Sequence, residues 1–316
     1  MFDGPLVATS ASEADGVAYG SEPNAWVGYD VTTVGDTDGD GIPELLAGGT
    51  GFDAAIGAAF LLEGPPGDGA IDTAAIARIS GDYNSEVAGS GVTGPGDLDG
   101  DGLDDVLVGA YYYRGASGRV ALFHGPVSDT TMSAADTTFT DVTNATNFGY
   151  HTVATDLDGD GYTDLFFGAP SSSASGAGGA GAVYGLSGPF SAGTLTSADA
   201  TVSILCDAFH AGAGLSFDLD DVDGDGSADL LLGGSGLPVF GSYDGGAWLF
   251  YGPLESGTTS TAHTTWTASE PGQFAGFAVD LDDLDGDGRA EALVGGYAAS
   301  MWGRSMAGMG WMFWGE

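Results

Sequence analysis

The chain has 316 residues, and its 45 aspartate and glutamate residues against 5 lysine and arginine residues give a formal charge of -40 at pH 7. This balance excludes the cationic surface that binding to nucleic acid or to an anionic membrane requires. Hydrophobic residues make up 43% of the chain and 58 positions are glycine, which favours a folded core of short strands and tight turns over an acidic disordered tail. The single cysteine, Cys206, excludes an internal disulfide.

Repetition dominates the pattern of predicted elements. A nine-residue acidic segment begins at Asp36, Asp97, Asp156, Asp221 and Asp283, so the spacing between copies is 61, 59, 65 and 62 residues. A short apolar run ending in glycine follows each copy, at 45–48, 106–109, 165–168, 230–233 and 292–295. Apolar runs of this length bounded by glycine, proline and aspartate predict strands, whereas no longer stretch has the 3.6-residue periodicity of a helix.

Each repeat therefore holds about four strands in roughly 62 residues, which is the size of a propeller blade. We predict an all-β fold, a β-propeller of five four-stranded blades that forms a single domain over residues 1–316. In chain order the predicted repeats are 26–87, 88–147, 148–210, 211–273 and 274–316, with residues 1–25 as a closing strand.

The two ends of the chain lie at the same phase of the repeat. Residues 2–5 and 313–316 both resemble the Phe-x-Gly-Pro sequence that ends the third strand of other repeats. We expect the N-terminal segment to complete the C-terminal blade as its outer strand, which would close the ring and remove a free sheet edge. Alternatively, the shared phase reflects the limits of a longer repeat array.

The acidic segments are predicted calcium sites. Carboxylates stand at positions 1, 3, 5 and 9, glycines at positions 4 and 6 permit a sharp turn, and position 7 offers a backbone carbonyl. The predicted ligands are Asp36, Asp38, Asp40, Ile42 and Glu44; Asp97, Asp99, Asp101, Leu103 and Asp105; Asp156, Asp158, Asp160, Tyr162 and Asp164; Asp221, Asp223, Asp225, Ser227 and Asp229; and Asp283, Asp285, Asp287, Arg289 and Glu291. So many oxygens favour calcium over magnesium.

A plain hairpin turn and an EF-hand both fit the acidic segments less well. Asp-Gly pairs are common in hairpin turns, but five copies with the same ligand spacing exceed what a turn requires. An EF-hand needs glutamate at position 12, where this chain has Ala47, Val108, Phe167, Leu232 and Val294, and it also needs flanking helices. We therefore expect about five calcium ions, each holding a β-hairpin.

The repeat resembles the FG-GAP repeat of integrin α-subunit propellers and related bacterial proteins. Phe148-Gly149-Tyr150, the acidic segment at Asp156 and the sequence Gly-Ala-Pro at 168–170 match the namesake signature within one unit. The resemblance covers nearly the whole chain and implies calcium at positions 1, 3, 5, 7 and 9 of each acidic segment, between the first two strands of a blade. Familiar members have seven blades, whereas this chain supplies five.

Enzyme motifs are scarce, because the histidines occupy different repeat positions and the paired carboxylates belong to the acidic segments. We expect a noncatalytic binding or adhesion module that is secreted or lies at the cell surface, with a protein or glycan ligand, although residues 2–5 do not resemble a signal peptide. No run of about 18 apolar residues predicts membrane insertion. A calcium-dependent lectin is the alternative, and a polysaccharide-degrading enzyme fits less well.

The loops between the second and third strands are the candidate ligand sites, since they should emerge opposite the calcium loops. Aromatic residues and arginine, which are typical of recognition surfaces, gather there. The candidate residues are Tyr111, Tyr112, Tyr113, Arg114, Tyr243, Trp302 and Arg304. The alternative is that these side chains only fill the bases of the loops or the central channel.

Overall fold

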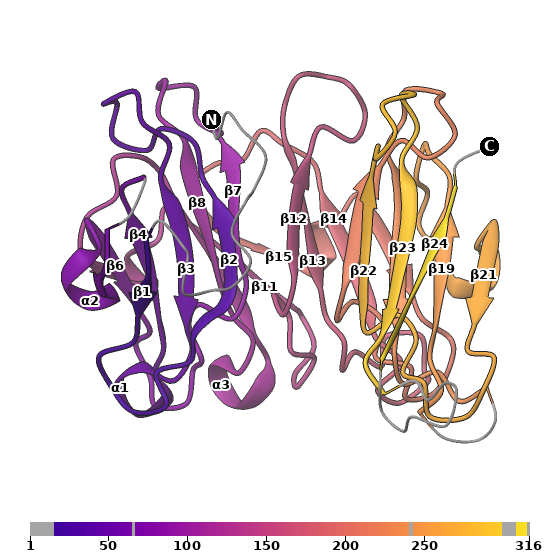
Figure 1. Cartoon of the computed structure of the whole chain (residues 1–316). Helices are drawn as coiled ribbons and strands as arrows, with labels where there is room; N and C mark the ends of the chain where they lie inside the picture. The colour runs from indigo at the N-terminus through magenta and orange to yellow at the C-terminus, as the bar shows by residue number, and fades with distance from the viewer. Residues whose placement is uncertain (1–15, 65–66, 240–242, 299–307, 315–316) are drawn as a thin grey trace.

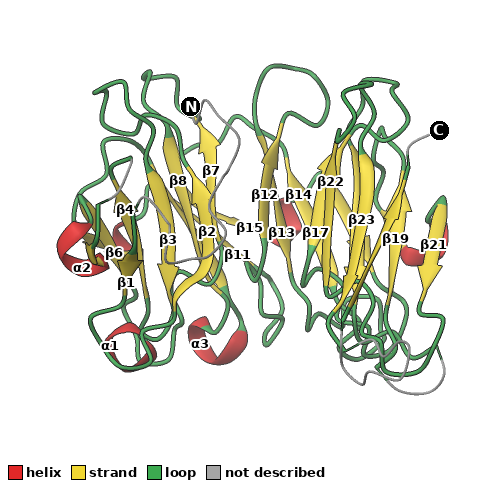
Figure 2. Cartoon of the chain, in the orientation of Figure 1, coloured by secondary structure: helices red, strands yellow, loops and turns green. Residues whose placement is uncertain are grey.

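The computed structural model describes residues 16–64, 67–239, 243–298 and 308–314 (Figure 1). Within these residues the strands form five mainly antiparallel sheets, numbered here from the N-terminus, and one two-stranded parallel sheet; the helices are single turns of three or four residues (Figure 2). The all-β fold predicted from the sequence is confirmed. None of the described helices has the length and apolar character needed to span a membrane.

Sheets 1 to 4 each contain four antiparallel strands in the order in which they occur along the chain. Sheet 1 contains β2 (Val27–Thr33), β3 (Leu45–Gly49), β4 (Ala58–Leu62) and β6 (Ala77–Ser80); sheet 2 contains β7 (Val92–Gly96), β8 (Asp105–Ala110), β9 (Arg119–Phe123) and β11 (Thr137–Thr140). Sheet 3 contains β12 (Thr152–Thr155), β13 (Asp164–Gly168), β14 (Ala182–Leu186) and β16 (Val202–Leu205); sheet 4 contains β17 (Phe217–Asp220), β18 (Asp229–Gly234), β19 (Gly246–Phe250) and β21 (Thr264–Thr267).

Sheet 5 has three strands among the described residues, β22 (Ala278–Asp282), β23 (Glu291–Gly296) and β24 (Met309–Phe313). The remaining strands are short and pair in parallel with a fourth strand: β10 (Thr130–Thr131) with β6, β15 (Gly193–Thr196) with β11, and β20 (Gly257–Thr258) with β16. In the same way, β1 (Ala18–Tyr19) pairs with β5 (Gly69–Ala70). The predicted pairing of the N-terminal segment with the last sheet stays a prediction, and residues 1–15 of that segment lie outside the described residues.

The helical turns lie in the connections between strands. α1 (Phe52–Ala55) and α3 (Tyr113–Ala116) connect the second and third strands of sheets 1 and 2, and α2 (Ile71–Ala74) follows β5. The 3-10 turns η2 (Met132–Ala134), η3 (Ser197–Asp199) and η4 (Thr259–Thr261) precede the fourth strands of sheets 2, 3 and 4. α1 and α3 lie at the lower end of the molecule in Figure 1.

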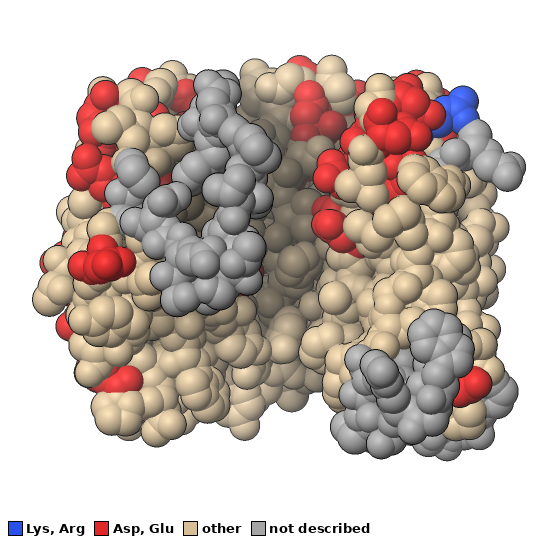
Figure 3. Space-filling view, in the orientation of Figure 1, with Lys and Arg blue, Asp and Glu red and all other residues tan. Residues whose placement is uncertain are grey.

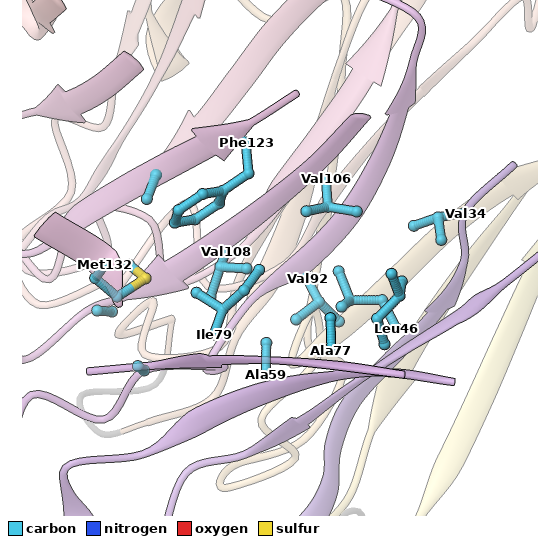
Figure 4. Close-up of a cluster of buried hydrophobic side chains, with 14 residues drawn as sticks. Val34, Leu46, Ala59, Ala77, Ile79, Val92, Val106, Val108, Phe123 and Met132 are labelled. Carbon is cyan, nitrogen blue, oxygen red and sulfur yellow. The ribbon is translucent and has the colours of Figure 1, made fainter. Parts of the chain in front are cut away.

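The core consists of apolar layers between consecutive sheets. Between sheets 1 and 2, Leu46, Ile79, Val108 and Phe123 pack with Met132 (Figure 4). Both faces of an internal sheet are covered by its neighbours, so every residue of its second and third strands is buried, as β8 and β9 of sheet 2 show. Phe139, Phe148 and Phe167 form an aromatic layer between sheets 2 and 3, in which the Phe167 ring centroid lies 4.9 Å from that of Phe139 and 5.2 Å from that of Phe148.

The first strands of consecutive sheets contact one another in chain order, from β2 through β7, β12 and β17 to β22. Hydrogen bonds that involve a side chain connect these first strands, instead of the backbone hydrogen bonds that join strands within a sheet. Val92 donates its N–H to Asp30 over 2.9 Å, and Thr93 donates its hydroxyl to the Thr152 carbonyl over 3.1 Å. His151 Nε2 lies 3.1 Å from the Phe217 carbonyl oxygen, and the Leu281 N–H donates to Asp218 over 2.9 Å. The strands β2 and β22, at the two ends of this series, form no comparable contact within the described residues.

Candidate metal centres

The five acidic segments form the hairpin loops between the first and second strands, and all of them lie at the same end of the sheets (Figure 1). Acidic atoms gather at that end of the visible surface, whereas the opposite end is mostly uncharged (Figure 3). In every loop three ligand atoms of predicted carboxylates lie within 4.8 Å of one another. Charges this close repel strongly without a cation.

The first aspartate organises each loop. Asp36 accepts the N–H of Gly39 on one carboxylate oxygen over 2.7 Å and the N–H of Gly41 on the other over 2.8 Å. Asp97, Asp156, Asp221 and Asp283 make the same pair of bonds. The glycines at positions 4 and 6 have φ between +73° and +93°, a left-handed conformation that requires glycine.

Positions 3 and 5 extend this pattern. In the first loop Asp38 accepts the N–H of Asp40, and Asp40 accepts the N–H of Ile42, over 3.1 and 2.7 Å. The other loops repeat both bonds. Since position 7 would contribute only its backbone carbonyl, its side chain is free to vary, which accounts for Ile, Leu, Tyr, Ser and Arg at that position.

The carboxylate at position 9 is buried at the start of the second strand. Glu44, Asp105, Asp164, Asp229 and Glu291 are all at most 3% exposed, and each accepts the N–H of position 2. Burial raises the pKa of Asp105, Asp164 and Asp229, although backbone hydrogen bonds favour their charged forms. His124 lies 3.0 Å from Asp105, whereas Asp164 and Asp229 have no cationic side chain among the described residues to offset burial, and a bound cation would supply that charge.

One buried atom supplies a direct test of the metal assignment. Glu44 accepts the N–H and the hydroxyl of Thr37 on Oε2, both over 2.7 Å, while its Oε1 is buried without a hydrogen-bond partner among the described residues. A buried carboxylate oxygen without a partner carries a desolvation cost that a cation would remove. The donor set, composed only of oxygens, fits a hard cation such as calcium.

A residue near the second loop was missed by the sequence analysis. His124 Nδ1 lies 3.0 Å from Asp105 Oδ2 and 3.8 Å from Asp99 Oδ2. Burial opposes the charged imidazole, but the hydrogen bond and charge of Asp105 raise the His124 pKa overall. The sequence feature that could have indicated this contact is the position of His124 directly before Gly125, because the Gly125 N–H also donates to Asp105 over 3.1 Å.

Neighbouring loops contact each other at two places. The Asp104 N–H donates to the carbonyl of Asp36 over 2.9 Å, which joins loop 2 to loop 1. The Ala290 N–H donates to the carbonyl of Asp221 over 2.7 Å and joins loop 5 to loop 4. Each bond involves the backbone of a predicted ligand at position 1.

The candidate ligand residues on the opposite face fall into separate groups. Tyr111 packs 4.9 Å from Tyr150, whose hydroxyl lies 3.1 Å from that of Tyr29, so three consecutive sheets contribute to one tyrosine cluster. Tyr112 is 46% exposed and packs edge-on against Tyr111. Burial, followed by the neighbouring tyrosines, raises the Tyr29 pKa above its ordinary value.

Tyr113 and Arg114 belong to a second group, centred on a buried cation. Arg119 is 4% exposed, pairs with Glu86, and contacts Asp82 over 2.6 Å. Its guanidinium also lies 4.3 Å from the Tyr113 ring, and Arg114 lies 5.0 Å from the same ring. This contact gives Tyr113 a packing role whatever else it does.

Tyr243 lies in the connection between β18 and β19 of sheet 4, two sheets after the sheet that carries Tyr113 and Arg114. Its ring is 58% exposed and stacks on Phe274 at 5.9 Å, and Phe274 in turn packs 5.0 Å from Tyr297. Trp302 and Arg304 lie outside the described residues. The structure therefore places the described candidates in at least two aromatic groups, on sheets 1 to 3 and on sheets 4 and 5.

Comparison with known proteins finds one family model and several relatives with similar sequences. The family model described as FG-GAP repeat matches residues 89–123 and 148–186. Relatives include integrin alpha-E of Mus musculus, 30% identical over 239 residues that cover 67% of this chain and 20% of the relative. Phosphatidylinositol-glycan-specific phospholipase D of Homo sapiens is 30% identical over 212 residues, 63% of this chain and 25% of the relative.

A shorter match reaches higher identity. Integrin alpha-V of Gallus gallus is 37% identical over 75 residues, which cover 24% of this chain and 7% of the relative. The chain therefore aligns with a quarter or less of the length of each of these relatives.

Proposed function

Because this chain carries FG-GAP repeats and is homologous to integrin α-subunits, which are FG-GAP β-propeller proteins, we propose that it is a calcium-stabilised, noncatalytic module for binding or adhesion. It acts outside the cell or at the cell surface, and its ligand binds the face opposite the calcium loops. Residues 1–316 form one propeller of five blades with the repeat boundaries given above. The buried, unpartnered Oε1 of Glu44 is the observation that most directly supports a cation in the loops.

Calcium would be held by the carboxylates at positions 1, 3, 5 and 9 and by the carbonyl at position 7 of each loop. It would neutralise the most concentrated negative charge of the chain and fix each hairpin. Calcium sites of extracellular modules are weak enough to fill at millimolar calcium and to stay empty in the cytosol, which supports an extracellular location. Calcium adds no chemical step, since the proposed role is structural.

A calcium titration of the chelated protein tests this proposal. Selective binding to the folded state adds about 2.7 kcal/mol per site at a hundredfold excess over the dissociation constant, so several sites should raise the unfolding midpoint strongly. Calorimetry should count about five ions, and magnesium at the same concentration should produce a much smaller shift. Absence of both binding and stabilisation would overturn the calcium assignment.

The favoured ligand is a protein. The lower end shows few charged atoms on the face visible in Figure 3, and Tyr112 and Tyr243 are exposed. Both features support this end as the recognition surface, because aromatic side chains are enriched at binding hot spots. Replacement of Tyr112 or Tyr243 by alanine should weaken ligand binding without changing the calcium count. A ligand that binds both variants and the wild type equally would place recognition elsewhere.

A calcium-dependent lectin is the second candidate. The tyrosine cluster favours it, since aromatic rings also stack on sugars; Tyr29 is 40% exposed, and Tyr111 and Tyr150 are half-buried beside it. A glycan array probed with calcium-loaded protein distinguishes the two, because a lectin should give calcium-dependent hits that the chelated protein loses. A polysaccharide-degrading enzyme is less favoured and would require turnover that depends on a side chain of the lower face.

A further inference from the structure

The two contacts between neighbouring acidic loops, numbered 1 to 5 along the chain, are equivalent. In both, the N–H at position 8 of one loop donates to the carbonyl at position 1 of the preceding loop, over 2.9 Å from Asp104 to Asp36 and 2.7 Å from Ala290 to Asp221. Position 8 lies between two predicted ligands, the carbonyl at position 7 and the carboxylate at position 9. Each hydrogen bond therefore connects the ligands of one loop to the first aspartate of another.

The side chain at position 7 makes a second contact at both places. A Cβ atom on Gly39 would lie 3.2 Å from Leu103 Cδ2, and a Cβ atom on Gly224 would lie 3.0 Å from Arg289 Nε. Both glycines stand at position 4 of the preceding loop, and each donates its N–H to the first aspartate of that loop over 2.7 Å. The residue that offers its carbonyl as a ligand in one loop therefore packs on the turn of the preceding loop.

Loops 1 and 2 share further contacts. A Cβ atom on Gly35, directly before loop 1, would overlap the carboxylate of Asp104, and one on Gly125 would lie 2.8 Å from the carbonyl oxygen of Thr37. Thr37 also donates to Glu44, whose Oε1 is buried without a hydrogen-bond partner among the described residues. The oxygen that most directly supports a bound cation therefore lies in a loop that packs against its neighbour.

Loop 3 lacks both contacts. Among the described residues, which include all five loops, no backbone hydrogen bond joins Thr163 at position 8 to the carbonyl of Asp97, or Ala228 to that of Asp156. A Cβ atom on the position 4 glycine of loop 2 or loop 3 would meet nothing within 4 Å. Loop 1 has Pro43 at position 8, and proline has no N–H to donate. The loops therefore form two pairs, 1 with 2 and 4 with 5, and one single loop.

We propose that calcium binds these loops as two coupled pairs and one independent site, an inference that rests on the calcium binding proposed above. When loop 2 is occupied, the carbonyl of Leu103 and the carboxylate of Asp105 are fixed, and so is the Asp104 N–H between them. That N–H holds the carbonyl of Asp36, whose carboxylate organises loop 1. Loop 1 is then already ordered when its own ion arrives, so it binds that ion more tightly.

Repulsion between two bound ions opposes this coupling but is weakened in two ways. Loops 1 and 2 each carry four predicted carboxylate ligands, so an occupied loop keeps a negative charge and still attracts the ion of its neighbour. The carboxylates at positions 1, 3 and 5 are exposed or half-buried, and salt at physiological strength screens exposed charges beyond about 8 Å. The hydrogen bond and the packing contacts are short-range, so we expect the coupling to be positive.

Removal of one ion tests the coupling. Asp99→Asn removes a predicted ligand at position 3 of loop 2, and the calcium affinity of loop 1 should then fall at least about fivefold. The amide NMR signals of Gly39 and Gly41 report the affinity of loop 1 during a calcium titration. Asp158→Asn, the same change in loop 3, is the matched control and should leave loop 1 unchanged. Because coupling is reciprocal, Asp38→Asn should weaken loop 2 by the same factor.

Proline at position 8 tests the hydrogen bond itself. Asp104→Pro removes the N–H, and Pro43 shows that position 8 of such a loop accepts proline. In the Asp104→Pro background, Asp99→Asn should weaken loop 1 by less than about twofold. Asp104→Ala keeps the N–H and should retain most of the coupling, and Thr163→Pro in loop 3 controls for proline alone.

The possible outcomes separate this inference from the proposed function. An equal effect of Asp99→Asn and Asp158→Asn on loop 1 would overturn the pairing although calcium still binds. A tighter loop 1 in Asp99→Asn would show that repulsion dominates and would also overturn it, and coupling that survives Asp104→Pro would overturn the role of this hydrogen bond. Absence of calcium binding to the wild type would instead overturn the proposed function itself.

Discussion

Replacement of Asp229 by asparagine separates the structural role of a calcium-loop carboxylate from its role as a ligand. Asp229 is fully buried and accepts the Val222 N–H over 2.9 Å and the Gly252 N–H over 2.7 Å. Asparagine has one acceptor oxygen, so one of these N–H groups would face an NH₂ group instead. Loss of a hydrogen bond to a charged group costs about 1.5–3 kcal/mol.

Calcium should increase this cost. In chelator, Asp229→Asn should lower the free energy of unfolding by about 1.5–3 kcal/mol, offset in part because burial raises the pKa of this carboxyl and disfavours its charge. At calcium a hundredfold above the dissociation constant, loss of the site should remove about 2.7 kcal/mol more. The total loss should therefore reach about 4–6 kcal/mol, and the difference between the two conditions reports the ion.

Urea unfolding with and without chelator measures both values. Asp141→Asn is the matched control, because Asp141 accepts the hydroxyls of Ser197 and Thr143 far from any calcium loop. Its cost should be the same in both conditions. An Asp229→Asn cost that does not depend on calcium would refute the assignment of this loop as a cation site.

Three further outcomes are expected. Arg119→Met should cost about 3–5 kcal/mol in urea unfolding, because it leaves the buried charge of Glu86 without a partner. Burial, followed by the charge of Asp280, raises the Asp218 pKa to about 6. The contribution of Asp218 to stability is therefore full below pH 4 and is lost as the pH rises through 6. Carboxyl NMR should find the Asp218 titration midpoint at this pH, and Asp280→Asn should lower that midpoint only partly. Phe139→Ala should cost about 3–5 kcal/mol by calorimetry, since its ring is fully buried between two sheets.

Local features of the fold and of the acidic loops were predictable from the sequence, whereas calcium in these loops stays a prediction. All predicted ligands of one loop lie within nine residues, and the turn depends on the φ angles of two glycines. The spacing of Asp36, Gly39 and Gly41 is therefore enough to predict the hydrogen bonds that shape the loop. The strands were predictable for the same reason, because short apolar runs bounded by glycine have few alternatives.

Features that depend on how sheets meet were not predictable. The contact of His124 with Asp105 requires the register of β9 against β8, which sets residues 19 positions apart side by side. The left-handed backbone of Val87, a β-branched residue, is unfavourable in isolation and is held by hydrogen bonds to the loop of the preceding sheet. Tertiary contacts of this kind leave no local pattern.

The placement of every acidic loop at one end of the sheets also gives the molecule an electric polarity. Its more negative end is the one with the acidic loops, and the end with α1 and α3 shows fewer acidic atoms on the face visible in Figure 3. Near an anionic surface the field turns the more negative end away, so the molecule arrives with its less acidic end leading. If calcium binds in the acidic loops as proposed, it would reduce this polarity, and the calcium concentration would then set how strongly the molecule is oriented before contact.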